Sequence, residues 1–198
     1  NFNKKDYPKF EDKIIHLVLD NDPVEKDINL QKDPHWLRQS SIDRIEAQRN
    51  YISKALDEAD QNDYIIYSDN DEIPNLSKVD FKKNKIEILI FKQKLFYYKF
   101  NLAYPRVDWF GTKACKLKDL KNISWLRNIK NKKYNIFRLD TFFSDLKHRN
   151  LKIIDDGGWH FTNLKTPEEL LKKYLNDEMH SEFELNNSNL KEIKNKIE

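Results

Sequence analysis

The segment 64–74 reads Tyr-Ile-Ile-Tyr-Ser-Asp-Asn-Asp-Glu-Ile-Pro, an apolar run followed at once by a group of carboxylates. Short β-prone runs such as its first four residues form strands that are buried on both faces. Pro74 ends the strand, because proline cannot donate a hydrogen bond to a sheet ladder. In open α/β sheets ligands bind at the carboxyl ends of the strands, which is where this spacing places Asp69 and Asp71. The two carboxylates can share one divalent cation or form a solvated Asx-turn, and this segment alone leaves both interpretations open.

Length and composition predict one soluble, globular domain. The 198 residues include 36 basic and 33 acidic side chains mixed along the chain, and the net charge of +3 gives little reason to expect a nucleic-acid partner. The single cysteine, Cys115, excludes an internal disulfide and is consistent with a reducing compartment. No apolar run approaches the roughly 18 residues of a transmembrane segment. We therefore expect a cytoplasmic protein, or one that is peripheral at a membrane surface.

The remaining patterns indicate alternating strands and helices. A helix is predicted over 40–59, where Ser40 and Asp43 form an N-terminal capping pattern. Arg49 interrupts the apolar stripe of this helix, so it can brace the acidic turn, reach an anionic ligand beside that turn, or extend to solvent. Further strands are predicted at 13–19, 86–91, 95–102 and 107–117, further helices at 75–81 and 117–129, and the ambiguous region 132–150 offers a strand at 134–138 and a helix at 141–147.

The segment 151–164 runs from a predicted strand through two acids and a glycine pair into Trp159 and His160. Two adjacent glycines, in a chain with only three, indicate a conformation or a close approach that a side chain would forbid. His160 beside this pair is the strongest functional candidate among the histidines. Thr166 and Glu169 then form a capping box, which predicts the start of a helix. Since no glycine-rich loop is present, a bound diphosphate would need a metal and side chains to neutralise it.

Four short segments occur in a characteristic order: Gln-Arg-Asn-Tyr-Ile at 48–52, Ser-Asp-Asn-Asp-Glu-Ile-Pro at 68–74, Gly-Trp-His-Phe-Thr at 158–162 and His-Ser-Glu-Phe at 180–183. In order and spacing they resemble glycosyltransferase family 17, the family of the β-1,4-mannosyl-glycoprotein N-acetylglucosaminyltransferase. The resemblance covers roughly residues 10–185. It implies a GT-A-like nucleotide-diphospho-sugar transferase fold, an α/β sandwich with a mostly parallel central sheet flanked by helices.

The same resemblance sets the expected domain organisation. One catalytic domain is expected over 1–198, with 186–198 as a C-terminal helical extension. The N-terminal strand-and-loop region that family members carry before the equivalent of 13–15 is not found. We therefore expect this chain either to be a fragment or to lack the first sheet strand and part of the nucleotide pocket.

The implied activity is metal-dependent, inverting transfer of a sugar to a glycan hydroxyl. The implied donor is UDP-N-acetylglucosamine, and the implied cofactor is Mn²⁺ or Mg²⁺. Asp71 would coordinate the metal, Asp69 would contact the ribose or a metal-bound water, and His160 would complete the coordination as a neutral imidazole. Together with the metal, Arg49 would stabilise the departing diphosphate.

Two further roles follow from the resemblance and from the chemistry of inversion. Gln48 would contact the donor alongside Arg49, and Trp159 would form a wall of the donor or acceptor pocket. An inverting displacement also needs a general base on the acceptor hydroxyl. Asp156 is the first candidate for this base and Glu182 the second, with Asp155 and Glu72 behind them.

Two other functions are kept as alternatives. A metal-dependent phosphohydrolase could use Asp69 as its nucleophile, since two carboxylates after a strand also suit phosphoryl chemistry. A non-catalytic domain could bind a glycan or a nucleotide without turnover. Release of phosphate from simple monoesters would favour the first, and glycan binding that is unaffected by metal chelation would favour the second.

Overall fold

A computed structural model describes residues 2–24, 33–135, 137–175 and 190–197 of the chain. The chain divides into two compact units, Asn1–Ala59 and Asp60–Glu198. The described residues contain four α-helices, and no described helix has the length and apolar character needed to cross a membrane. Each unit is considered by itself below.

The first unit consists of short helical turns and one long helix. Its elements are the 3-10 helices η1 (Lys4–Asp6), η2 (Glu11–Lys13) and η3 (Ile52–Ala55) and the α-helix α1 (Pro34–Tyr51). Helix α1 begins earlier than predicted, because Asp33 is its N-cap and accepts a hydrogen bond from His35 N at 3.1 Å. Ser40 lies inside the helix and is buried, so it is not the cap. The strand predicted at 13–19 is wrong: residues 14–19 form no regular structure, and Ile15 and Val18 are exposed.

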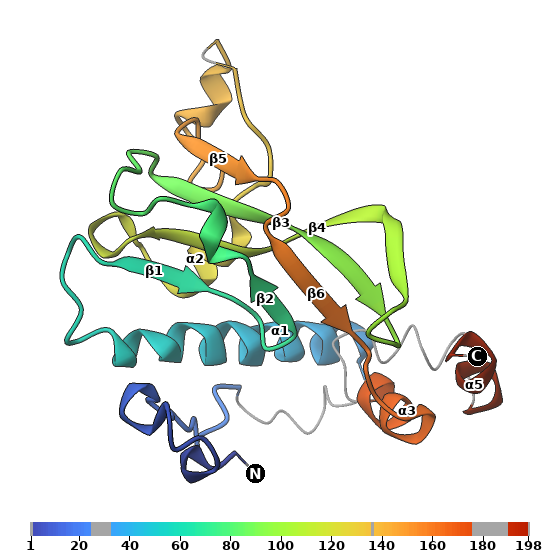
Figure 1. Cartoon of the computed structure of the whole chain (residues 1–198). Coiled ribbons are helices and arrows are strands. Elements are labelled where there is room, and N and C mark those ends of the chain that lie inside the picture. The colour runs from blue at the N-terminus through green and yellow to red at the C-terminus, as the bar shows by residue number, and fades with distance from the viewer. Residues whose placement is uncertain (1, 25–32, 136, 176–189, 198) are drawn as a thin grey trace. The chain divides into compact units, whose positions relative to one another are not determined.

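The second unit is built around one mixed sheet (Figure 1). Its strands run in the order β1-β4-β3-β6-β2, and β5 pairs with β3. The pairs β1–β4, β2–β6 and β3–β4 are antiparallel, whereas β3–β5 and β3–β6 are parallel. The strands are β1 (Tyr64–Tyr67), β2 (Glu72–Pro74), β3 (Ile88–Tyr97), β4 (Ala103–Lys116), β5 (Leu151–Ile154) and β6 (Gly158–Thr162).

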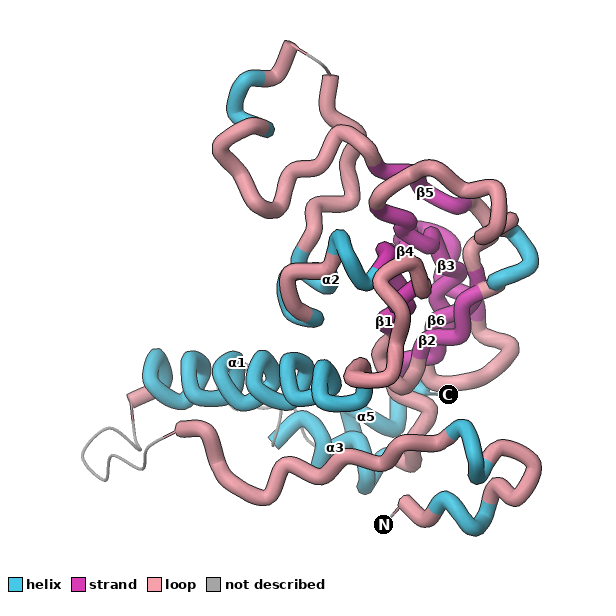
Figure 2. Tube along the Cα trace, turned by 90° about the vertical axis from the view of Figure 1, so that its left-hand side faces the viewer, coloured by secondary structure: helices cyan, strands magenta, loops and turns pink. Residues whose placement is uncertain are grey.

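This sheet overturns the predicted fold class. The prediction of a GT-A-like sandwich, with a mostly parallel sheet flanked by helices, is wrong: the sheet is mostly antiparallel, curled into a half-barrel and accompanied by few helices. The predicted strands 86–91 and 95–102 are largely one strand, β3, which turns back directly into β4. Strands β1 and β2 stand at opposite ends of the strand order but lie close together in both views (Figures 1 and 2).

The core lies where both faces of β3 are covered. Leu89 and Phe91 point to one face and pack with Ala114, Ile154 and the segment around Phe81, while Ile88 and Ile90 point to the other. All four of these β3 side chains are fully buried. Burial on both faces gives this segment a continuous apolar sequence, which is typical of strands in parallel sheets, although its longest pairing is antiparallel.

Short elements complete the unit: the 3-10 helices η4 (Leu76–Lys78), η5 (Leu117–Asp119) and η6 (Leu139–Thr141), and the α-helices α2 (Ile123–Asn128), α3 (Pro167–Leu175) and α5 (Leu190–Ile197). The predicted capping box of α3 is confirmed, since Glu169 N donates to Thr166 Oγ1 at 3.2 Å and Thr166 N donates to Glu169 Oε2 at 3.0 Å. The ambiguous region 132–150 contains η6 and turns, and its described residues contain neither the predicted strand nor the predicted helix.

Candidate functional site

The two segments that carry most of the family resemblance lie side by side on neighbouring strands. Strand β2 pairs with β6 so that Glu72 is opposite His160 and Pro74 is opposite Gly158, and Phe161 N donates to Asp71 O at 2.8 Å. Gly158 has a φ of +131°, and a Cβ there would stand 2.1 Å from Ile73 O. The predicted need for glycine at this point is therefore confirmed. It allows β2 and β6 to pair and brings the acidic turn beside the histidine.

Glu72 anchors the interior of the half-barrel. Its side chain is fully buried; Oε1 accepts from Trp109 Nε1 at 2.8 Å, and Oε2 accepts from Thr112 Oγ1 at 3.2 Å and from Asp69 N at 3.3 Å. Burial raises the pKa of this carboxyl, and the bond from Trp109 opposes the rise. Gly111 makes room for the carboxylate, because a Cβ there would stand 1.8 Å from Glu72 Oε1. Glu72 is thus a structural anchor and cannot reach a substrate as a general base.

Asp69 is held by an arginine that the sequence did not single out. Its Oδ1 accepts from Tyr67 Oη at 2.5 Å, and its Oδ2 accepts from Arg127 Nε at 3.2 Å and Nη2 at 3.0 Å. Arg127 lies in α2 with a side chain that is only 19% exposed. A guanidinium with so little exposure requires a carboxylate partner, and in this arrangement Asp69 is that partner. The predicted contact of Asp69 with a ribose or a metal-bound water stays a prediction.

A buried lysine fixes the end of α2 from which Arg127 projects. Lys113 Nζ donates to the carbonyl oxygens of Arg127 at 2.7 Å and Ile129 at 2.5 Å. Burial lowers the pKa of Lys113 to about 7, and the neighbouring Arg127 contributes in the same direction. Even a neutral amine keeps two N–H groups, so both hydrogen bonds survive deprotonation. The only signal in the sequence for Lys113 and Arg127 is that each charge stands in an apolar segment and must find a partner.

His160 and Asp71 face one another across a short gap. His160 Nδ1 lies 3.6 Å from Asp71 Oδ1, which is too far for a hydrogen bond. This nitrogen is buried and has no hydrogen-bond partner. The imidazole stacks on the indole of Trp109, with ring centroids 4.2 Å apart. Burial lowers the pKa of His160, although Asp71 opposes that shift, and the neutral imidazole is the form that ligates metals.

This pair fits two positions of a divalent metal site. Asp71 supplies a carboxylate with a side chain that is 32% exposed, and the unpartnered His160 Nδ1 supplies a nitrogen. Asp69 fits less well, because its oxygens already accept from Tyr67 and Arg127. Within the described residues no group of three or more His, Cys, Asp or Glu side chains is placed to hold a metal ion. A metal ion held here would therefore need further ligands from outside the described residues, such as water.

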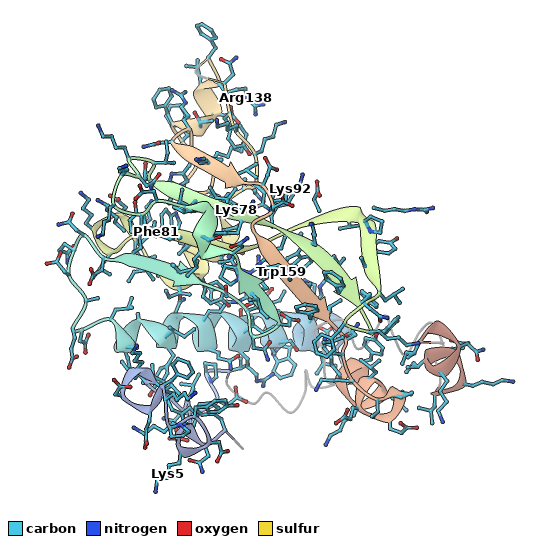
Figure 3. The ribbon with its side chains drawn as sticks, in the orientation of Figure 1. Lys5, Lys78, Phe81, Lys92, Arg138 and Trp159 are labelled. Atoms are coloured by element: carbon cyan, nitrogen blue, oxygen red, sulfur yellow. The ribbon has the colours of Figure 1, made fainter. Side chains whose placement is uncertain are left out.

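The structure does not bring Trp159 and Asp156 into this cluster. Trp159, labelled on β6 in Figure 3, alternates with His160 and so points to the opposite face of the sheet, where it is 39% exposed. Asp156 has a side chain that is 62% exposed and forms ion pairs with Lys94 at 3.4 Å and Lys78 at 4.0 Å. Asp155 is more exposed still and lies 3.6 Å from Lys92 Nζ. A role for either acid as a base at Asp71 would need these contacts to rearrange.

Three predicted site residues remain outside this geometry. Gln48 and Arg49 lie in α1 of the first unit, so their proposed contacts with a donor stay predictions. Glu182 lies outside the described residues.

Comparison with known proteins assigns neither a family nor a function to this chain. No family model, curated protein or solved structure matches this chain. The functional argument therefore depends on the side chains of the cluster. They combine a carboxylate and a neutral imidazole that suit a divalent cation with a partly buried arginine that suits an anion.

Proposed function

We propose that this chain is a metal-dependent, inverting glycosyltransferase that moves a sugar from a nucleotide-sugar donor to a glycan hydroxyl. The observation that carries the proposal is the pairing of β2 with β6, which sets Asp71 and His160 3.6 Å apart. These residues belong to the two segments on which the resemblance to family 17 mainly depends. By that resemblance, the donor is UDP-N-acetylglucosamine.

In this proposal the side chains of the cluster divide the work of binding the donor. Asp71 and His160 would hold Mn²⁺ or Mg²⁺, and the bound ion would supply positive charge against the diphosphate. Asp69 orients Arg127, so that the guanidinium presents its remaining donors in a fixed plane. The charge of Arg127 acts at this site, since it contributes to lowering the pKa of His160. Positive charge fixed in advance stabilises a diphosphate that departs with growing negative charge.

The geometry narrows the choice of general base. Glu72 is excluded by its burial and its three hydrogen bonds. Asp156 stays a proposal that requires it to leave Lys94 and Lys78. Glu182 stays a proposal from the resemblance alone.

The phosphohydrolase alternative gains no support from the environment of Asp69. A nucleophilic carboxylate needs an oxygen that is free to attack, whereas both oxygens of Asp69 accept hydrogen bonds from Tyr67 or Arg127. These bonds also stabilise the ionised form and make its oxygens weaker nucleophiles.

The test is release of UDP from UDP-N-acetylglucosamine, measured with Mn²⁺ and with a chelator, with and without a mixture of glycan acceptors. We expect metal-dependent release that falls at least tenfold in Asp71→Asn and in His160→Gln. The matched control is Asp57→Asn, which changes an exposed aspartate of the first unit and should keep full activity. Phosphate release from p-nitrophenyl phosphate without any release of UDP would overturn the proposal in favour of the phosphohydrolase.

A further inference from the structure

The ladder between β3 and β4 opens near the turn of the hairpin. Lys94 is opposite Asp108 and Phe96 is opposite Ala103, so two steps along β3 are matched by five along β4. The extra residues bulge out of the ladder. Two cavities of about 280 Å³ and about 450 Å³ lie at this opening, and Leu95, Ala103 and Tyr104 line both. Ligand pockets are typically about 300–1,000 Å³, so the larger cavity alone has room for a small ligand, and the smaller one adjoins it through the shared residues.

The larger cavity has an aromatic wall. Besides the shared residues it is lined by Tyr97, Tyr98 and Leu102. Tyr104, in the shared wall, is 46% exposed and offers a ring to a ligand in either cavity. Tyrosine combines a flat apolar surface with a hydroxyl that donates and accepts hydrogen bonds, which suits a ligand that has both apolar and hydroxylated surfaces.

The smaller cavity is lined by charges that are already paired. Lys92 Nζ, on the side chain labelled in Figure 3, lies 3.1 Å from Asp108 Oδ2, and Lys94 Nζ lies 3.4 Å from Asp156 Oδ1. Two lysines and two aspartates leave the lining with no net charge. An ionic ligand would have to separate one of these pairs, whereas a neutral ligand with hydroxyl groups can donate to the carboxylates and accept from the ammonium groups.

The cavities are also close to one proposed metal ligand. Leu95 lines both cavities and is paired with His160 on the neighbouring strand β6.

We infer that these two adjoining cavities, here together named the hairpin cavity, bind a neutral saccharide that serves as the acceptor. The tyrosines contact the sugar ring, and the paired aspartates and lysines contact its hydroxyl groups. The role as acceptor rests on the proposed function, whereas saccharide binding does not.

The test uses the whole chain without nucleotide or metal. Chitobiose, mannobiose and lactose serve as neutral probes, and glucose-6-phosphate serves as a charged one, with binding followed by saturation-transfer NMR and calorimetry. We expect at least one neutral disaccharide to bind in preference to the phosphate sugar. Tyr104→Ala and Asp108→Asn should each weaken this binding at least tenfold. Tyr7→Ala, which removes a similarly exposed tyrosine from the first unit, should leave it unchanged.

The outcomes separate this inference from the proposed function. Disaccharide binding that is lost in folded Tyr104→Ala and Asp108→Asn supports the hairpin cavity, even if UDP fails to bind with Mn²⁺. Failure of all three disaccharides to bind, or equal binding by the wild type and both variants, overturns it even if UDP binds. Thermal unfolding of each variant distinguishes loss of binding from loss of folding, and the milder Tyr104→Leu replaces any alanine variant that unfolds.

Discussion

Gly111→Ala tests whether the interior of the half-barrel is organised around Glu72. The added Cβ would stand 1.8 Å from Glu72 Oε1 and 2.4 Å from Trp109 Nε1, both far inside van der Waals contact. The Glu72 side chain is fully buried and makes three hydrogen bonds, so it cannot move aside without losing some of them. Overpacking costs about 1–3 kcal/mol and a lost hydrogen bond to a buried charge about 1.5–3 kcal/mol. We therefore expect Gly111→Ala to reduce the free energy of unfolding by roughly 3–5 kcal/mol.

The assay is urea unfolding of four proteins: wild type, Gly111→Ala, Glu72→Ala and the double variant. Glu72→Ala removes the nearer obstacle and also the carboxylate that holds the Trp109 indole in place, so the cost of Gly111→Ala should fall by at least about 1.5 kcal/mol in that background. A large coupling energy between the two positions would locate the effect at the contact itself. A cost below about 1 kcal/mol in the wild-type background, or strictly additive costs, would refute the reasoning.

Three further predictions follow from single contacts. In the folded protein the pKa of Lys113 is lowered to about 7, whereas its ordinary value is 10.5. Between these two pH values the unfolded state binds more protons than the folded state. The free energy of unfolding should therefore rise with pH, by up to about 1.4 kcal/mol per pH unit. Urea midpoints from pH 7 to 9 should show this rise in the wild type and no such rise in Lys113→Met. The measurement ends at pH 9 because burial raises the pKa of Cys115 to about 12, so that above pH 9 the Cys115 thiol makes the free energy of unfolding fall with pH. Arg127→Lys should cost about 1–3 kcal/mol of unfolding free energy in the wild-type background and much less in the Asp69→Asn background, because the pairing is then already lost; equal costs in both backgrounds would contradict the pairing. Thr166→Ala should destabilise α3 by about 0.5–2 kcal/mol, seen as faster amide exchange in 167–175, and unchanged exchange there would exclude the capping box.

The sequence predicted those features whose physical causes are local. The apolar run of β1 precedes a turn that ends it, the glycine pair before His160 reflects a close approach of β2, and Thr166 caps a helix with the residues that directly follow it. In each case the residues that determine the structure are adjacent or a few positions apart. The juxtaposition of Asp71 with His160 came from the resemblance and not from any local rule.

Strand direction could not be predicted for a physical reason. Residues 88–91 are fully buried, with the segment near Phe81 packed on one face, and such a continuous apolar run occurs in both parallel and antiparallel sheets. The partner that decides the direction, β4, follows after a turn at 98–102 that lacks glycine and proline. The strand predicted at 13–19 failed because an apolar run forms a strand only beside a partner strand, and this one pairs with none in the described chain.

The side chains around the acidic turn were missed for a related reason. Trp109 and Arg127 contact Glu72 and Asp69 across dozens of intervening residues, and no spacing in one sequence reports such contacts. Asp156 was favoured because it stands beside the glycine pair. Strand alternation instead places the neighbouring Trp159 on the face opposite His160, and Asp156 pairs with lysines that line that face.

Calorimetric titration of UDP, with and without Mn²⁺, tests the central claim most directly. The proposed site predicts that wild type binds UDP only when Mn²⁺ is present, and that folded Asp71→Ala and His160→Ala bind at least tenfold more weakly. Asp57→Asn should bind as wild type does. Binding that is indifferent to Mn²⁺, or that persists unchanged in both site variants, would contradict a metal-dependent donor site between β2 and β6.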